Sequence, residues 1–312
     1  MSPFGEGGEY LAPVSYPIRE ILPDRYYLLT CRTQEQMFLL RPSLEVDKII
    51  AEWLIRAQRR YGIVIYAFIN MSSHWHLVCR SPGANVDQFV REFQGLLARF
   101  VNKHWKRSGT VFPRRYSLEP IQDDEKLIER IVYVLTNPAK ANLVDSIDNW
   151  PGLSSAPESL HRQSRTFCIF ARTAWHKAGR PDDKKPFQEF VRLEVAPPPG
   201  WEHLRPAECA RRLRELVYAR EEELRRERKA QGKKVLGVRR ILQASPTDRS
   251  AHPKKSPRPL CHASTRELWD EYRAHYAQFL ELYRIASKRY RDGETDVAFP
   301  PGSFPPWYRG AA

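Results

Sequence analysis

Cysteine is scarce in this sequence, and none of it has metal-binding or disulfide-framework spacing. The five cysteines are Cys31, Cys79, Cys168, Cys209 and Cys261, an odd number without a C-x-x-C pair. This pattern argues against a disulfide framework and against a cysteine zinc site. We therefore expect reduced thiols, as in a cytosolic protein, and we disfavour a structural zinc module.

Long apolar runs are also absent, and so are lipidation motifs, so no membrane partner is expected. The first residues, MSPFGEGGEYLAP, contain no basic stretch followed by an apolar one. A signal peptide is therefore not expected. The sequence shows no internal repeat, which gives no support to a repeat architecture.

Acidic residues are outnumbered, and this imbalance is the first functional indication. Lys and Arg total 51 against 37 Asp and Glu, which gives a net charge of +14. A surplus of this size favours a polyanionic partner such as nucleic acid, because bound phosphates release their counterions. Charge alone leaves open a basic protein that binds nothing acidic.

The order of predicted elements indicates an α+β fold. It runs strand, helix, strand, strand, helix, strand, which is the ferredoxin-like β-α-β-β-α-β arrangement, an antiparallel sheet with helices on one face. A further helix follows, opened by acidic residues and ended at Asn137-Pro138. The six elements are expected at 26–33, 43–61, 63–70, 74–80, 85–106 and 110–121.

Composition divides the chain into three predicted parts. Residues 1–24 are rich in Gly and Pro and are expected to form an extended arm, and 25–158 are expected to form the main folded domain, which holds the candidate site residues described below. Residues 159–312 are expected to form a basic, mainly helical extension of unknown role. Within this extension we expect a strand at 187–195, helices at 206–229 and 265–290, and a basic linker at 245–260.

The segment His74-Trp75-His76 is the sharpest chemical signal. Alternate residues of a strand point to the same face, so the two imidazoles project together while Trp75 points into the helical layer. Such a pair can ligate a metal. The alternative is two exposed histidines on a strand without a ligand.

Tyr133 lies on the helix predicted after Asp123, opposite its apolar stripe. It shares its face with Arg130 and with Asn137, one turn further on. A phenol, an amide and a nearby histidine pair can form a nucleophile-plus-metal site. The alternative is a surface tyrosine with a helix-terminal asparagine. The predicted stripe consists of Leu127, Ile128, Ile131 and Leu135.

Four motifs together resemble a known family. They are MSSHWHLV at 71–78, KRSGTVFPRRYS at 106–117, YVLTNPAKANLV at 133–144 and WPGLSS at 150–155. With them, residues 26–155 resemble the bacterial insertion-sequence-200-like transposases, and especially the REP-associated tyrosine transposases. The most specific feature is a histidine pair followed by Y-x-x-x-N-P.

The resemblance implies a single-tyrosine HUH mechanism. His74 and His76 would bind a divalent metal, Mg²⁺ or Mn²⁺, with Asn137 as third ligand, and Tyr133 would form a 5′-phosphotyrosine bond. The imidazoles alone would favour a zinc-like metal, since Mg²⁺ prefers oxygen. The implied partner is single-stranded or hairpin DNA of repeat elements, bound by a monomer or homodimer in the bacterial cytoplasm, associated with the nucleoid.

A basic cluster with interleaved aromatic residues is the expected DNA-binding surface, because unpaired bases stack on aromatic rings. The alternative is a solvated basic helix face. For the whole protein, two further hypotheses remain: a non-catalytic DNA-binding derivative of a transposase, and an HUH replication initiator or relaxase. The expected DNA-binding residues are Arg99, Lys103, Lys106, Arg107, Arg114, Arg115 and Arg130.

Overall fold

The structure is a computed structural model that describes residues 18–250 and 259–306. Its backbone contacts divide the chain into two units, of which the larger spans 22–275 and contains all predicted site residues. The predicted extended arm at 1–24 and the basic linker at 245–260 therefore fall partly outside the described residues. None of the helices in the described ranges combines the length and apolar character needed to cross a membrane.

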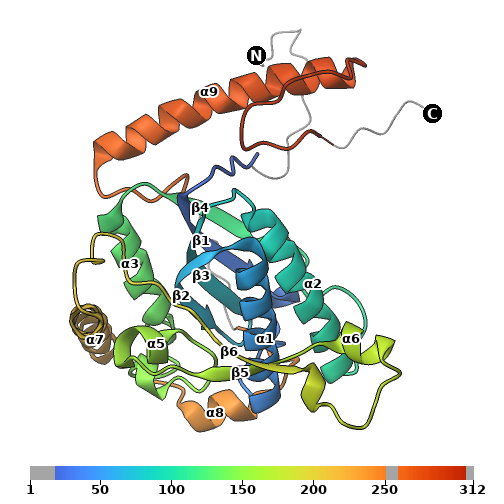
Figure 1. Ribbon diagram of the computed structural model, residues 1–312. Helices are drawn as coiled ribbons and strands as arrows, with labels where there is room; N and C mark the ends of the chain where they lie inside the picture. The colour runs from blue at the N-terminus through green and yellow to red at the C-terminus, as the bar shows by residue number, and fades with distance from the viewer. Residues whose placement is uncertain (1–17, 251–258, 307–312) are drawn as a thin grey trace, which may run out of the picture. The chain divides into compact units, whose positions relative to one another are not determined.

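A four-stranded antiparallel sheet forms the centre of the larger unit, in the order β2-β3-β1-β4 (Figure 1). The chain passes through β1, α1, β2, β3, α2 and β4 in turn. This is the predicted ferredoxin-like α+β fold, which is thereby confirmed. The bounds are β1 Arg25–Arg32, α1 Leu44–Tyr61, β2 Val64–Asn70, β3 His74–Ser81, α2 Val86–His104 and β4 Ser117–Ile121.

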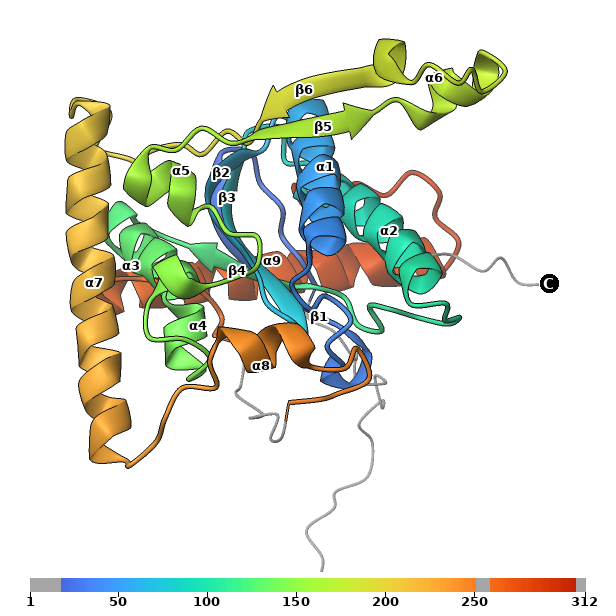
Figure 2. The same cartoon turned by 90° about the horizontal axis from the view of Figure 1, so that it is seen from below.

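Helices α1 and α2 pack on one face of the sheet (Figure 2). The hydroxyl of Ser43 caps α1 by accepting a hydrogen bond from the Val46 amide at 3.2 Å, and Gly62 ends the helix with a left-handed φ of 62°. The indole of Trp75 on β3 meets Phe93 on α2, with ring centroids 5.5 Å apart. Trp75 therefore points into the helical layer, as predicted.

The last strand of the sheet is shorter than predicted. β4 begins at Ser117, and residues 105–116 form a loop in place of the first half of the expected strand. Pro113 within it has no N–H for a strand ladder. The loop is tied to the end of β1, because the Gln34 amide donates to the carbonyl oxygen of Val111 at 2.8 Å.

Helix α3 (Asp124–Leu135) and the short α4 (Asn137–Lys140) lie on the opposite face of the sheet from α1 and α2 (Figures 1 and 2). Asp123 caps α3, since its carboxylate accepts from the Lys126 amide at 2.8 Å. The apolar stripe differs from the prediction at one position, because Val134 is buried and Ile128 only half-buried. The buried members are Leu127, Ile131, Val134 and Leu135.

The WPGLSS motif covers the edge of the sheet that is formed by β2. Backbone hydrogen bonds run from Asn70 to Leu153 and from Ser155 to Phe68, each at 2.8 Å. The Trp150 indole also donates to the carbonyl oxygen of Asn70 at 3.1 Å. An uncovered edge strand would present unpaired backbone groups to other chains, so this motif has a structural role.

The C-terminal part adds a hairpin and helices. The predicted strand at 187–195 corresponds to β6, whose antiparallel partner β5 was not predicted. The predicted helices at 206–229 and 265–290 correspond to α7 and α9. The remaining elements are η1 Gln34–Gln36, η2 Ile147–Asn149, α5 Ala156–His161, β5 Thr166–Phe170, α6 Arg172–Lys177, η3 Lys185–Phe187, β6 Gln188–Arg192, α7 Pro206–Ala230, α8 Val238–Gln243 and α9 Arg266–Arg291.

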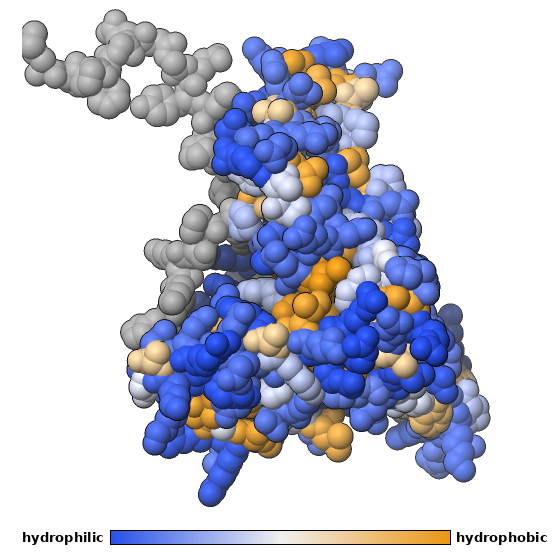
Figure 3. All heavy atoms as spheres, turned by 90° about the vertical axis from the view of Figure 1, so that its left-hand side faces the viewer, coloured by the Kyte–Doolittle hydropathy of each residue, from blue (hydrophilic) through white to orange (hydrophobic). Residues whose placement is uncertain are grey.

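Helix α7 packs on α3, α4 and α5 with one apolar face. Its buried Leu213 and Val217 belong to the same core cluster as Leu127 and Ile131 of α3. The outer surface on this side of the molecule is mostly hydrophilic (Figure 3). It carries ion pairs within the helix, such as Arg211 with Glu215 at 2.8 Å, whose side chains are exposed.

The smaller unit consists, within the described residues, of 18–21 and 276–306. In it, the segments before β1 and after α9 pack together and along the helix. The Tyr276 hydroxyl donates to the Ile18 carbonyl oxygen at 2.6 Å, and the Ile21 amide donates to Gly302 at 2.8 Å.

Candidate active site

The two histidines of β3 lie side by side on the face of the sheet that α3 covers. Their ring centroids are 4.8 Å apart, and the residues opposite them on β1 are Thr30 and Arg32. His76 is 5% exposed, whereas His74 is half-buried. The strand period of two therefore brings both imidazoles to one place, as predicted.

A neighbouring hydroxyl engages the Nδ1 atom of each imidazole. Thr30 Oγ1 lies 2.7 Å from His76 Nδ1, and Ser73 Oγ lies 3.1 Å from His74 Nδ1. When Nδ1 carries the proton and donates it to the hydroxyl oxygen, Nε2 keeps its lone pair. Histidines that ligate metals are commonly oriented in this way.

The environment of both rings keeps them neutral. Burial lowers the pKa of His74 to about 4, with a smaller contribution from the Arg32 guanidinium. Burial likewise holds the pKa of His76 well below its usual range, helped by His74 and Arg32. Neutral imidazoles are the form that binds metals.

Tyr133 and Asn137 reach the same point from α3 and α4. The Tyr133 ring centroid lies 5.8 Å from that of His76, and Asn137 Nδ2 lies 3.3 Å from His76 Nε2. Tyr133 is half-buried and packs partly against the core, rather than standing fully on the surface. The structure thus brings together all four residues that the motifs singled out.

The residues present fit a divalent cation. His76 Nε2 faces a carboxamide, and the oxygen and nitrogen of an amide are nearly isosteric, so Asn137 can present its oxygen. Two imidazoles and one amide oxygen then form a three-ligand set with room for substrate oxygens. In the described part of the chain, no group of three or more His, Cys, Asp or Glu side chains offers an alternative site.

Two opposing influences act on the hydroxyl of Tyr133. Burial, and then the charge of Glu119, raise its pKa, while Arg130 and a hydrogen bond with Asn137 lower it. The Arg130 guanidinium lies 5.2 Å and Lys140 Nζ 4.8 Å from the ring centroid. Two cations therefore flank the ring, but the net effect is a raised pKa, so the resting form of Tyr133 is the neutral phenol.

Sequence reasoning missed five residues of this site. The strand register puts Thr30, Arg32 and Glu119 on the same face as the histidines, and Arg32 is exposed there. Only the pairing of β1 with β3 and β4 reveals this, because the three residues occur in unremarkable local sequence. Lys140 was contained in the YVLTNPAKANLV motif but was not singled out, and His262 lay far away in the sequence.

His262 joins the sheet as an added parallel bridge beside β4. Its amide donates to Pro120 at 2.8 Å, and its carbonyl oxygen accepts from Gln122 at 2.9 Å. Its ring nitrogen Nε2 lies 2.8 Å from Glu119 Oε2, and the Ser117 hydroxyl donates to the other oxygen at 2.6 Å. Glu119 is therefore held in a fixed orientation on the Tyr133 side.

The expected DNA-binding residues divide between two places. Arg130 lies beside Tyr133, whereas Arg99 and Lys103 are exposed on α2, in the layer on the other side of the sheet. Arg107 folds back and donates to Asn102 at 2.9 Å. The remaining members, Lys106, Arg114 and Arg115, are exposed in the loop between α2 and β4.

Comparison with known proteins identifies the segment that contains the histidine pair and Tyr133. Residues 24–134 match the family model described as "Transposase IS200 like". This segment is related to the IS200-like transposases. The resemblance seen in the sequence is thereby confirmed for residues that include His74, His76 and Tyr133, while the match ends before Asn137.

Two solved structures are similar to the transposase-like segment. One is a REP-associated tyrosine transposase bound to a REP hairpin, at 16% identity and a TM-score of 0.41, covering 47% of this chain and 86% of that one. The other is assigned to a transposase of Deinococcus radiodurans R1, at 18% identity and a TM-score of 0.28, covering 41% and 93%. No curated protein matches the chain.

Proposed function

We propose that this protein is a single-tyrosine DNA transposase that cleaves and rejoins single-stranded DNA through a 5′-phosphotyrosine intermediate. The observation that carries the proposal is the meeting of Tyr133 with the histidine pair, at 5.8 Å between the Tyr133 and His76 ring centroids. The family match of residues 24–134 supports DNA strand transfer as the class of reaction. Hairpin DNA as the substrate rests on the resemblance to REP-associated transposases.

The reaction is a transfer of one phosphodiester bond. Tyr133 Oη forms a bond to the scissile phosphorus, and the bond from phosphorus to the 3′ oxygen breaks. The phenol loses its proton and the leaving 3′ oxygen gains one. The energy of the phosphodiester is kept in the protein–DNA bond, so the released 3′-hydroxyl can reverse the reaction without a nucleotide cofactor.

Each side chain around Tyr133 has a definite part in this scheme. Arg130 and Lys140, which lie over the ring, stabilise the phenolate. The exposed Arg32 faces the site from β1 and is placed to contact a phosphate oxygen. His74, His76 and Asn137 would hold Mg²⁺ or Mn²⁺, which supplies positive charge to the non-bridging phosphate oxygens.

Covalent attachment tests the proposal directly. The full-length protein is incubated with Mn²⁺ or Mg²⁺ and a labelled single-stranded hairpin from the repeats that flank its gene. We expect a protein–DNA adduct that survives denaturing electrophoresis. Tyr133→Phe should abolish the adduct and leave DNA binding within about twofold, because only the nucleophilic oxygen is lost.

Tyr218→Phe on α7 is the matched control, since its hydroxyl contacts Asp148 away from the histidine pair. It should form the adduct like the parent protein. An unchanged adduct yield in Tyr133→Phe would reject the nucleophile assignment. Tight DNA binding without any adduct in the parent protein would instead favour a non-catalytic derivative of a transposase.

A further inference from the structure

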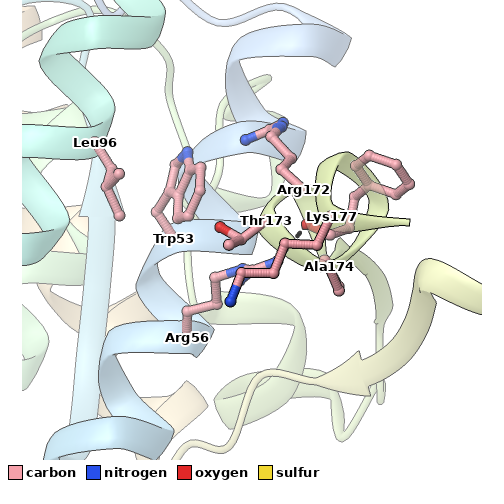
Figure 4. A pocket seen from close by; sticks show the side chains of 9 residues that line it. Trp53, Arg56, Leu96, Arg172, Thr173, Ala174 and Lys177 are labelled. Carbon is pink, nitrogen blue, oxygen red and sulfur yellow. Dashed lines mark hydrogen bonds between the residues drawn. The ribbon is translucent and has the colours of Figure 1, made fainter. Parts of the chain in front are cut away.

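A groove on the α1 and α2 side of the sheet has a composition suited to a second ligand. Its walls come from α1, α2 and the hairpin that carries α6 (Figure 4). Because α3 and Tyr133 lie on the other face of the sheet, this groove is separate from the candidate active site (Figure 2). It is lined by Trp53, Arg56, Leu96, Phe170, Arg172 and Lys177, among others.

The indole of Trp53 is the centre of the groove. It is half-buried, and the guanidinium carbons of Arg56 and Arg172 each lie 5.1 Å from its ring. Trp53 Nε1 is buried without a hydrogen-bond partner among the described residues, and so is Nε of Arg56. The groove thus offers an aromatic face flanked by two guanidinium groups.

Positive charge exceeds negative charge around this ring. Glu52, which is 3% exposed, is shared between Arg56 at 3.4 Å and Arg172 at 3.6 Å. Lys177 lies at the rim (Figure 4), and the lining residues include no acid. The Arg172 side chain is 46% exposed, so it can leave the indole and pair with an anion without uncovering the core.

An exposed basic stripe continues from the groove along α2. Arg99 and Lys103 follow Leu96 at helical spacing, and both are exposed. Beside them, the rings of Phe100 and His104 stack at 5.2 Å with an interplanar angle of 18°. The stripe leads into the 105–116 loop, which meets the end of β1 near Arg32 and the histidine pair.

We propose that the groove around Trp53 is a second binding site for single-stranded DNA. One base stacks on the indole in place of the Arg172 guanidinium, and Arg172 and Lys177 contact the adjoining phosphates. An unpaired base fits because it has an exposed flat face that can stack on the indole. A duplex keeps its bases stacked inside, and an acidic peptide would match the charge but not the aromatic surface.

The inference rests on the proposed function for the identity of the ligand, and it assigns a role to the C-terminal hairpin. DNA that leaves the active site would follow the 105–116 loop and α2 to this groove. The strand would then be held on both faces of the sheet, which would fix the distance between the cleavage point and the bound flank.

Fluorescence anisotropy with a labelled oligothymidine tests the groove on the full-length protein. Trp53→Leu should weaken binding on the order of tenfold, since one stacked base is lost. Arg172→Ala and Lys177→Ala should each lower the slope of log K against log salt by about 0.7, the value for one phosphate contact on a single strand. Arg211→Ala, an exposed arginine of α7, is the matched control and should leave both quantities unchanged.

The possible outcomes test the groove proposal and the proposed reaction independently of each other. If Trp53→Leu, Arg172→Ala and Lys177→Ala all bind like Arg211→Ala, the groove proposal is overturned, even when the Tyr133 adduct still forms. Displacement of the oligothymidine by polyglutamate at equal charge concentration would also overturn it, because the site would then respond to charge alone. Groove-dependent binding without adduct formation would reject the proposed reaction and support the groove.

Should Trp53→Leu lower the melting temperature, the Lys177→Glu variant tests the groove in its place, since Lys177 is exposed. Charge reversal there should weaken oligothymidine binding by several-fold and more strongly at low salt. Binding equal to that of the parent protein would count against the proposal.

Discussion

Single side chains in the candidate site depend on neighbours that the sequence does not place beside them. Thr30 is the clearest example, because its hydroxyl lies 2.7 Å from His76 Nδ1 although 46 residues separate the two. When this hydroxyl accepts from Nδ1–H, it holds the ring in the tautomer whose Nε2 keeps its lone pair. The histidine pair alone therefore does not define the site.

Thr30→Val should reduce metal affinity by about 10- to 100-fold, because the shape of the side chain is kept while the partner of His76 Nδ1 is lost. Calorimetric titration with Mn²⁺ measures this. Thr30→Ser keeps the hydroxyl and should bind nearly as well as the parent protein. Equal affinities for the valine and serine variants would show that the hydroxyl does not orient the ring.

Gly152, in the WPGLSS motif that covers the sheet edge, occupies a position without room for a side chain. A Cβ added there would lie 2.8 Å from Trp150 Nε1 and 2.9 Å from Pro42 Cγ. Gly152→Ala should lower the free energy of unfolding by about 1–3 kcal/mol, measured by chemical denaturation. Gly95→Ala on α2 meets nothing within 4 Å and should raise it by roughly 0.5–1 kcal/mol. A Gly152→Ala variant as stable as the parent would contradict the packing argument.

At the scale of elements, α7 clamps the segment that follows the Tyr133 helix. Arg228 is 6% exposed and donates to Asn142 Oδ1 at 2.9 Å and to the Ala139 carbonyl oxygen at 3.1 Å, and it pairs with Asp145. On the same helix, Glu221 accepts from the Ile147 amide at 2.6 Å. These bonds hold α4 and the segment after it, and hence Asn137, through side chains 74 to 89 positions further along the chain.

Arg228→Gln should lower the adduct yield by about tenfold or more while oligothymidine binding stays within about twofold, because misplacement of a site residue affects the chemical step first. Gel quantification of the adduct and anisotropy give the two values. Arg225→Gln, an exposed neighbour paired with Glu222, is the control and should change neither. A parallel loss of both activities would indicate general unfolding rather than a role in positioning.

At the scale of the whole molecule, stability should depend on pH through Asp47. Burial raises the pKa of Asp47 to about 7, opposed by a hydrogen bond from the Leu153 amide and by Arg165. Between about pH 4 and 7 the unfolded chain releases this proton and the folded one keeps it. The free energy of unfolding therefore falls as pH rises through this window.

Asp47→Asn should remove that loss, since an amide stays neutral and can still accept from Leu153. Its advantage over the parent protein should be near zero at about pH 4 and reach on the order of 1–3 kcal/mol above pH 7. Denaturation across this range measures it, and Glu45→Gln, exposed on the same helix, should leave the profile unchanged. An advantage of Asp47→Asn that does not vary with pH would exclude titration as the cause.

The predicted boundary at residue 158 remains a prediction at this scale. The structure shows that α7 shares its core cluster with α3, through Leu213 and Val217 against Leu127 and Ile131. Most of the C-terminal part as far as residue 275 therefore belongs to the same compact unit as the sheet. A fragment of residues 25–158 would lack α7 and would leave uncovered the part of the α3 apolar face that α7 buries.

Local signals predicted those features that depend on neighbours in sequence. The period of two at His74 and His76 and the predicted helix range 43–61 agree with β3 and α1, because strand direction and helix capping are short-range effects. The first half of β4 was predicted wrongly, since apolar and aromatic residues of a loop resemble those of a strand. The hairpin partner β5 escaped prediction because its pairing is non-local.

The sequence by itself determined the order of elements, the pairing of two imidazoles on one strand face and the spacing from Tyr133 to Asn137. Only the tertiary structure decided that Thr30, Arg32 and Glu119 face them, that Arg228 holds the following turn, and that His262 joins the sheet. The physical reason is range: periodicity and capping act within a few residues, whereas register and helix docking depend on burial that the entire chain must satisfy.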